Sequence, residues 1–289
     1  MPHNKRVTVE SLAVMFIEWL KRHRSENTLK MYTGRLKAFR EAFGDRRPKK
    51  IKKWELEDHF LRENRWPDGT EKAPDTIRAN YIAAEQLEKF ALRNELIKKR
   101  FLYTFDKPVG RLRERLPTPE EVDKIKSVAS PAFRLVYQAL RQSGARPNEI
   151  ARMAFADWDQ SNSVIVLLKH KTAWKTGRPR KITVGEKLRG LILESLAGRT
   201  EGPLFVTPRG KAWTSNSISQ TFSRYRNRVG VDKAVVCYSA RHEHATAICS
   251  TLGMDAAADA LGHVNTTMTR RYVHKDPATL RSNQDSVSL

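Results

Sequence analysis

The sequence predicts a mainly helical protein of two domains, in which the second domain also carries a small antiparallel β-hairpin or sheet. Apolar residues recur at spacings of three and four over most of the chain, which is the helical period. A charged stretch at 108–116, with Pro and Gly, interrupts that pattern. One β-branched apolar run lies at 163–169. A length of 289 residues is sufficient for two domains of ordinary size.

The first segment, 7–107, has the pattern of a small helical domain. Thr8 can cap a first helix, and Ser25 can cap a second helix that ends at Gly44. A shorter helix is expected over 54–63, and a long amphipathic helix follows the turn-rich stretch 67–74. The apolar stripes of the three longer helices are Leu12, Met15, Phe16, Trp19 and Leu20, then Leu29, Tyr32, Leu36, Phe39 and Phe43, then Ile77, Tyr81, Ala84, Leu87 and Ala91. These stripes predict a compact four-helix domain.

The second domain is expected over 117–281, after the basic linker 108–116. It opens at Thr118-Pro119-Glu120-Glu121, a capping box with Pro at the first helical position. A helix over 133–142 leads to a hairpin with strands at 163–169 and 180–184. Further helices are expected at 186–196, 216–228, 241–251 and 255–261, and the polar tail 282–289 is expected to be loose.

Net charge indicates the partner. The chain has 54 Lys and Arg against 32 Asp and Glu, a net charge of +22, which favours binding to nucleic acid. Basic residues exceed acidic ones on both sides of Lys107, so both domains are expected to touch double-stranded DNA. Candidate phosphate contacts, for which a solvated surface is an equally good interpretation, are Arg46, Arg47, Lys49, Lys50, Lys52, Lys53, Arg111, Arg113 and Lys175.

Cysteine content and hydropathy indicate the compartment. Cys237 and Cys249 are too few for a disulfide framework and lack the spacing of a zinc site, which fits a reducing compartment. The longest apolar run is short, at 164–168, and the amino terminus lacks the apolar core of a secretion signal. We therefore expect a cytoplasmic protein associated with the nucleoid, without a membrane span.

Four residues stand out, although each also has an ordinary explanation. Arg146 precedes a Pro that can begin a helix, and Lys171 ends the first expected strand. His263 lies in a Leu-Gly-His sequence, and Tyr272 follows two arginines. A solvated turn, a hairpin tip, a helix end and a packed ring would account for them one at a time.

Their order along the chain resembles the tyrosine recombinase, or phage-type integrase, family. The resemblance covers nearly the whole chain: 7–107 is similar to the family's core-binding (SAM-like) domain and 117–281 to its catalytic domain. It implies a two-domain clamp around DNA. Arg146 and Arg241 match the two active-site arginines, and Glu149 matches the acidic residue three positions after the first of them.

The remaining family positions match less uniformly. Lys171 matches the hairpin lysine, with Lys175 as a rival, and His263 and Tyr272 match the last two catalytic positions. Where the family has His-x-x-Arg, this chain has Tyr238-Ser-Ala-Arg. A phenol can donate a hydrogen bond to phosphate but, with an ordinary pKa of ~10, it exchanges protons poorly near neutral pH.

The resemblance implies a reaction without metal, cofactor or ATP. Tyr272 would attack phosphorus and become joined to the DNA 3′ phosphate, while two guanidinium groups neutralise the phosphate. Lys171 would protonate the leaving 5′ oxygen, His263 would assist, and Glu149 would orient the cations. Helix ends and solvated faces explain the aspartate pairs Asp157/Asp159 and Asp255/Asp259 more simply than metal binding does.

The function implied is that of a site-specific recombinase, an integrase of a mobile element acting as a homo-tetramer on two DNA sites. Two alternatives stay open. One is relaxation of supercoils by a monomer, as in type IB topoisomerases. The other is a DNA-binding regulator with a weakened active site, for which Tyr238 would be the sign of decay.

Overall fold

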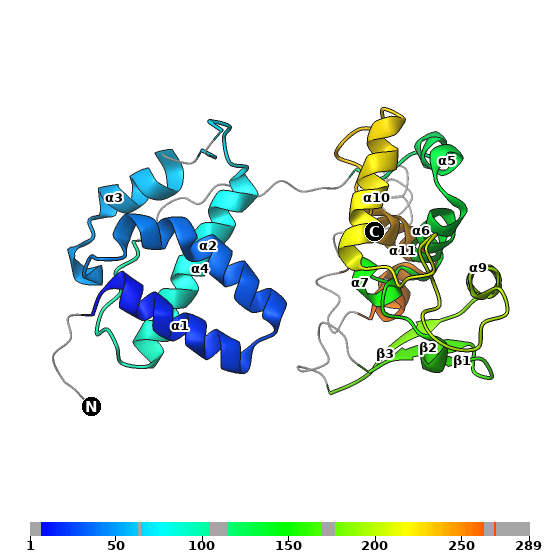
Figure 1. The fold of residues 1–289 in the computed structure, drawn as a ribbon, viewed down its shortest axis with the longest axis horizontal. Helices are drawn as coiled ribbons and strands as arrows, with labels where there is room; N and C mark the ends of the chain where they lie inside the picture. The colour runs from blue at the N-terminus through cyan, green and yellow to red at the C-terminus, as the bar shows by residue number, and fades with distance from the viewer. Residues whose placement is uncertain are drawn as a thin grey trace, which may run out of the picture. The chain divides into compact units, whose positions relative to one another are not determined.

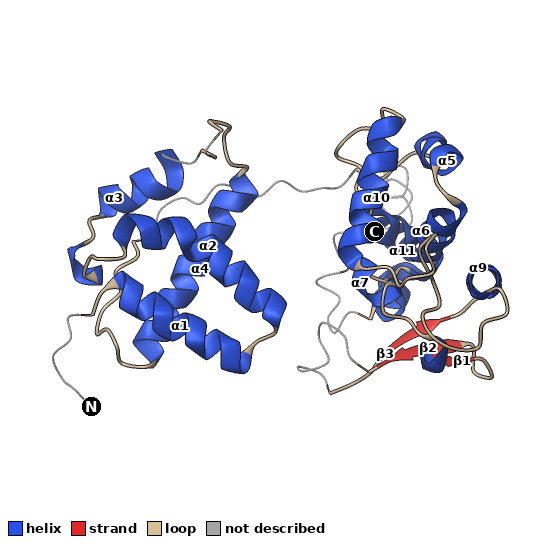
Figure 2. Ribbon diagram, viewed as in Figure 1, coloured by secondary structure: helices blue, strands red, loops and turns tan. Residues whose placement is uncertain are grey.

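The computed structural model describes residues 7–62, 65–66, 68–103, 115–168, 177–262 and 269. The chain divides into two compact units, 1–112 and 113–289 (Figure 1). The described part of the first unit is helical, whereas the second unit combines helices with one small sheet (Figure 2). Among the described residues, no helix has both the length and the apolar character needed to cross a membrane.

Four α-helices lie in the described part of the first unit, and the first two begin at side-chain caps. They are α1 (Val9–His23), α2 (Glu26–Phe43), α3 (Lys53–Glu57) and α4 (Pro74–Arg93), with a 3₁₀ turn η1 (Pro48–Lys50) and a π-helical turn η2 (Asp58–Arg62). The Thr8 and Ser25 side chains accept hydrogen bonds from the backbone N–H groups of Ser11 and Thr28, so both predicted caps are confirmed.

The first unit departs from expectation in two places. Met15 was expected in the core but is 37% exposed, because the buried stripe of α1 runs through Leu12, Phe16 and Leu20. The helix expected over 54–63 is only five residues of α-helix followed by the π-helical turn η2. Gly44 ends α2 as expected, with a right-handed backbone. A Cβ there would lie 2.5 Å from the Arg40 carbonyl oxygen, so the position requires glycine.

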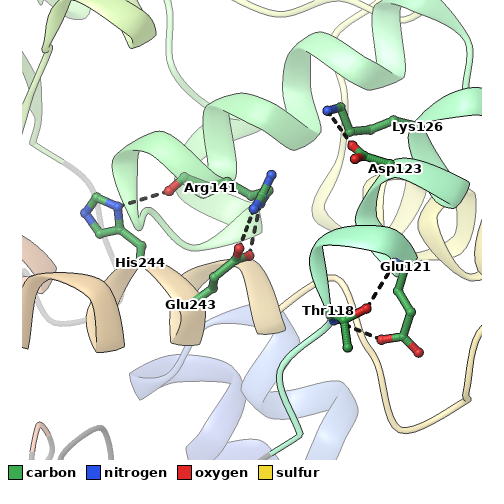
Figure 3. Close-up of polar contacts among 7 residues, drawn as sticks. All are labelled: Thr118, Glu121, Asp123, Lys126, Arg141, Glu243 and His244. Atoms are coloured by element: carbon green, nitrogen blue, oxygen red, sulfur yellow. Dashed lines mark hydrogen bonds and ion pairs between the residues drawn. The ribbon is translucent and has the colours of Figure 1, made fainter. Parts of the chain in front are cut away.

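Most helices of the second unit begin at a proline or a hydroxyl cap. They are α5 (Pro119–Val128), α6 (Pro131–Ser143), α7 (Pro147–Ile150), α9 (Glu186–Leu196), α10 (Ser215–Arg228) and α11 (Ser239–Leu261), with a 3₁₀ turn η3 (Phe155–Asp157). The predicted capping box of Thr118 and Glu121 starts α5 (Figure 3). Two helices were expected within α11. They are joined at Gly253, whose φ of 87° breaks the helical path.

Among the residues that the structure describes, the sheet has three strands rather than the two of a simple hairpin. The strands β1 (Trp158–Asp159), β2 (Val164–Leu167) and β3 (Arg180–Thr183) pair antiparallel in the order β1-β2-β3. Ile165 pairs with Ile182, and both are buried in the core. The two-residue strand β1 is too short to show an alternating pattern, so the sequence did not predict it.

Helix α6 packs in the core of the second unit and also contacts α11. On one face, the rings of Phe133 and Tyr137 pack in the core with the ring of Phe222 from α10. Near the end of the helix, the Arg141 guanidinium forms an ion pair with Glu243, and the Arg141 carbonyl oxygen lies 3.0 Å from Nδ1 of His244 (Figure 3). These contacts hold the first half of α11 against the end of α6, where the candidate site begins.

Candidate active site

The turn between α6 and α7 presents Arg146. Gly144 ends α6 with a left-handed φ of 58°, and a Cβ there would lie 2.4 Å from the His244 ring, so only glycine fits. Pro147 then starts α7, with Arg146 at the N-cap. The Arg146 side chain is 19% exposed, whereas the Glu149 side chain beside it is only 4% exposed.

Glu149 holds Arg146 in place. Its carboxylate accepts a hydrogen bond from the Arg146 backbone N–H at 2.9 Å and another from Nη1 of the Arg146 guanidinium at 2.8 Å. Glu149 is only 4% exposed. Burial alone would raise its pKa, but the hydrogen bonds and the charge of Arg146 outweigh burial and lower it. Glu149 is therefore a buried carboxylate that stays ionised beside a cation.

Arg241 joins this turn to both ends of α11. It lies in the first turn of α11 and is 1% exposed. Its Nη1 donates to the Gly144 carbonyl oxygen at 2.5 Å, and its Nη2 donates to the Leu261 carbonyl oxygen at 3.0 Å. Gly144 precedes Arg146 by two residues, so one contact brings the segments of the two predicted arginines side by side.

A third arginine, Arg180, belongs to the same cluster and was missed by sequence reasoning. It begins β3, is 6% exposed, and donates from Nη2 to the Ala260 carbonyl oxygen at 2.6 Å. Burial lowers its pKa to about 10; Glu149 opposes that shift, whereas Arg241 and Arg146 add to it. A signal was available, because alternation along β3 places Arg180 on the same inward face as Ile182.

The remaining predicted site residues are placed only in part. Tyr238 is at the N-cap of α11, is 38% exposed, and its ring meets the His242 ring edge-on at 5.2 Å between centroids. Lys171, Lys175, His263, Tyr272, Arg111 and Arg113 lie outside the described residues, as do most of the linker 108–116 and the tail 282–289.

The aspartates considered as metal ligands have structural partners or exposed positions. Asp157 accepts a hydrogen bond from the Ala154 N–H, and Asp159 accepts from Ser161 and Asn162 in the turn after β1. Asp255 and Asp259 are exposed on α11. Over the ranges that the structure describes, no group of three or more His, Cys, Asp or Glu side chains is arranged to hold a metal ion.

The first unit has a second basic surface that the sequence did not single out. A groove, which we call the α2–α4 groove, is lined by Lys30, Met31, Gly34, Arg35, Lys37, Ala38, Glu41, Arg65, Trp66, Lys72, Thr76 and Asn80. The Lys72 ammonium lies 5.6 Å from the centre of the exposed Trp66 ring, and Arg35 donates to Asn80 at 3.3 Å. By contrast, Arg46 of the predicted basic run is tied to Glu55 in an ion pair.

Replacing Glu149 tests the electrostatics of the cluster. Glu149→Gln is expected to lower the free energy of unfolding by about 1–3 kcal/mol at pH 7, because the Arg146 guanidinium loses its hydrogen-bonded counter-charge. Since the folded pKa of Glu149 is lowered, its charge stabilises the fold above the unfolded pKa of about 4.3, and that contribution is lost as the pH falls through the folded value. Urea unfolding at several pH values measures this. A difference between the two proteins that does not shrink toward acid pH would contradict it.

Comparison with known proteins shows which family the chain resembles. The model of the "Phage integrase family" matches residues 117–279, more than half of the chain. The tyrosine recombinase XerC of Serratia marcescens is 25% identical over 108 residues, covering 35% of this chain and 36% of that protein. A second XerC, from Pelotomaculum thermopropionicum, is 24% identical over 155 residues, covering 49% of each chain. The chain thus spans less than half the length of either relative.

Solved structures of integrases share the fold. A lambda integrase tetramer bound to a Holliday junction superposes with a TM-score of 0.77 at 18% identity, covering 93% of this chain and 78% of that one. The Tn1549 transposon integrase in complex with transposon right-end DNA gives a TM-score of 0.74 at 18% identity, covering 98% of this chain and all of that one (100%). With the family model matched over most of the second unit, the chain belongs to the phage integrase family of tyrosine recombinases.

Proposed function

We propose that this protein is a site-specific recombinase that cleaves and rejoins duplex DNA through a covalent 3′-phosphotyrosyl intermediate at Tyr272. The observation that carries the proposal is the contact of Arg241 with the Gly144 carbonyl oxygen, because it draws together the segments that hold two guanidinium groups. Paired guanidiniums match the oxygens of a phosphodiester and stay charged at all working pH values.

The proposed reaction conserves the energy of the broken linkage. The Tyr272 phenol passes its proton to His263 while its oxygen attacks phosphorus in line. The bond from phosphorus to the 5′ oxygen breaks, and that oxygen takes up a proton from Lys171 or its rival Lys175. Rejoining reverses these steps, as the 5′ hydroxyl attacks the phosphotyrosine and releases the phenol. No metal or ATP is needed for this cycle.

We further propose an integrase role for a mobile element, with four copies acting on two DNA sites in the cytoplasm, at the nucleoid. The likeness to an integrase named for a transposon supports the first part, and a lambda integrase tetramer on a Holliday junction supports the second. Supercoil relaxation by a monomer is the alternative. A plasmid carrying two sites distinguishes them, since recombination yields new junctions and relaxation does not.

The α2–α4 groove is proposed as a DNA contact of the first unit. In Lys37→Gln/Lys72→Gln, two cations that flank the groove are lost, so the slope of log affinity against log salt is expected to fall by about 0.9 for each phosphate contact removed. Filter binding over a salt series measures the slope. Lys124→Gln, on an exposed face of α5, is the control. An unchanged slope in the double variant, or an equal loss in the control, would exclude the groove.

A nicked substrate tests the covalent step. Duplexes bound by the wild-type protein are first selected from a random-sequence pool and then rebuilt with a nick close to each candidate cleavage position, so that the released 5′ fragment diffuses away. Rejoining is thereby prevented, and the adduct accumulates as a slower band on a denaturing gel. Tight binding with no adduct from any duplex would overturn the proposal in favour of a DNA-binding regulator.

A further inference from the structure

The site contains a third arginine, Arg180, beside the two that the sequence predicted. The charges of Glu149, Arg241 and Arg146 all act on the Arg180 guanidinium, and only that of Glu149 is negative. Because burial lowers the pKa of Arg180 only to about 10, its guanidinium is charged at neutral pH. The three guanidinium groups and the one carboxylate therefore carry a net charge of about +2, counted over the described side chains of this cluster. Like charges buried together destabilise a fold unless an anion offsets them.

The Arg180 side chain is buried, and its guanidinium is hydrogen-bonded to main-chain carbonyl groups. Its Nη1 donates to the Lys181 carbonyl oxygen and its Nη2 to that of Ala260, both at 2.6 Å. A Cβ on Gly262 would lie 2.8 Å from Nη1 and 2.9 Å from Cδ, so the glycine packs directly on the side chain. Nε is buried and has no hydrogen-bond partner in the part of the chain that the structure describes.

Two arginines thus hold the last turn of α11. Arg180 binds the Ala260 carbonyl and Arg241 binds the next one, that of Leu261. These carbonyls have no partner within the helix, and cations are favoured at this end of the helix dipole. One arginine comes from the sheet and the other from the start of α11, so the sheet, the α6–α7 turn and the end of α11 meet through guanidinium groups.

We infer that Arg180 is a positioning residue of the proposed cleavage site, one that fixes the end of α11 on β3 and adds the charge that favours the transition state over the bound substrate. A phosphodiester carries one negative charge, whereas attack by a deprotonated phenol gives a phosphorane that carries up to two. A cluster with two excess positive charges matches the phosphorane better than it matches the phosphodiester. Such a cluster lowers the barrier to cleavage more than it strengthens binding of the substrate. This inference rests on the proposed cleavage function.

Two substitutions separate the effect of the Arg180 charge from the effect of its hydrogen bonds to main-chain carbonyl groups. Arg180→Lys keeps the charge but loses the paired donors, and Arg180→Met loses both. Each is compared with wild type for thermal stability, DNA affinity and the rate of adduct formation on the nicked substrates. Arg199→Met is the matched control, since Arg199 also donates to main-chain carbonyls, those of Ser195 and Pro203, but is not among the charges acting on Arg180.

A second substrate carries a neutral methylphosphonate at the scissile position. With one negative charge removed from the DNA, the single excess positive charge left in Arg180→Met again matches the transition state. On ordinary DNA, Arg180→Met is expected to cleave about 10²-fold more slowly than wild type, with affinity changed by less than about 3-fold. On the methylphosphonate, the deficit is expected to fall below about 10-fold, and Arg180→Lys should lie between the two proteins on ordinary DNA.

The outcomes are distinct. If the deficit of Arg180→Met is equal on both substrates, or no larger than that of Arg199→Met, the inference is wrong. Should Arg180→Met fail to fold, Arg180→Lys decides, because a rate per folded molecule equal to that of wild type would also overturn it. Loss of affinity with an unchanged cleavage rate would overturn it too. Absence of adduct from wild type would instead show that the proposed function itself has failed.

Discussion

Tyr272→Phe is expected to abolish the covalent adduct while leaving DNA affinity nearly intact. The substitution removes one phenolic oxygen, which is the atom proposed to form the bond to phosphorus, and leaves the ring and every basic residue in place. Affinity for DNA arises mainly from phosphate contacts made by Lys and Arg, so it has no reason to change by more than about 2-fold. Adduct on the nicked substrate and binding by filter retention are measured in parallel.

Tyr238→Phe is the matched control for that experiment. Tyr238 is an exposed tyrosine of the second unit, and it lies at the start of α11, three residues before Arg241. We expect Tyr238→Phe to retain the adduct at a reduced rate, because a hydrogen-bond donor to phosphate is lost but the nucleophile is not. Adduct that persists in Tyr272→Phe and disappears in Tyr238→Phe would identify Tyr238 as the nucleophile and contradict the assignment.

Local sequence predicted those features of the fold that local physics controls. The caps at Thr8, Ser25 and Thr118 were readable because a side-chain oxygen reaches a backbone N–H only three residues away. The strand β1 could not be predicted in this way, because two residues are too few to show an alternating pattern and the strand forms only by pairing with β2. The exposure of Met15 was missed for a related reason, since a helix has several apolar flanks and its neighbours decide which one is buried.

The site shows the same division. Arg146 and Glu149 are three residues apart, so their mutual capping geometry is a local property. The Arg241 bond to Gly144 spans 97 positions, and the Arg180 bond to Ala260 spans 80, so only folding brings these groups together. Arg180 was overlooked because arginine in a strand is usually solvated. Its position on the inward face of β3, alternate with Ile182, was the one indication to the contrary.

The second large effect is expected at Arg241. Removing one preorganised donor from a developing negative charge slows catalysis by about 10²- to 10³-fold, and Arg241→Ala is expected to reduce adduct formation by at least that factor. The same change leaves the carbonyls of Gly144 and Leu261 without their guanidinium donor in a buried place, which costs about 1–3 kcal/mol for each unsatisfied group. A lower cleavage rate therefore counts only when it is expressed per folded molecule.

Arg241→Lys separates the two effects. Lysine keeps one positive charge but cannot donate to two carbonyls and a phosphate in the fixed planar geometry of a guanidinium. We expect its folded fraction to approach that of wild type while its cleavage rate stays at least about 10-fold lower. The reason is that lysine keeps the positive charge but lacks the paired donors that match a phosphate. Arg199→Ala serves as the stability control, since it also removes donors from main-chain carbonyls. If Arg241→Lys and Arg199→Ala both cleave at the wild-type rate per folded molecule, Arg241 supports the α6–α7 turn and α11 but has no part in the reaction.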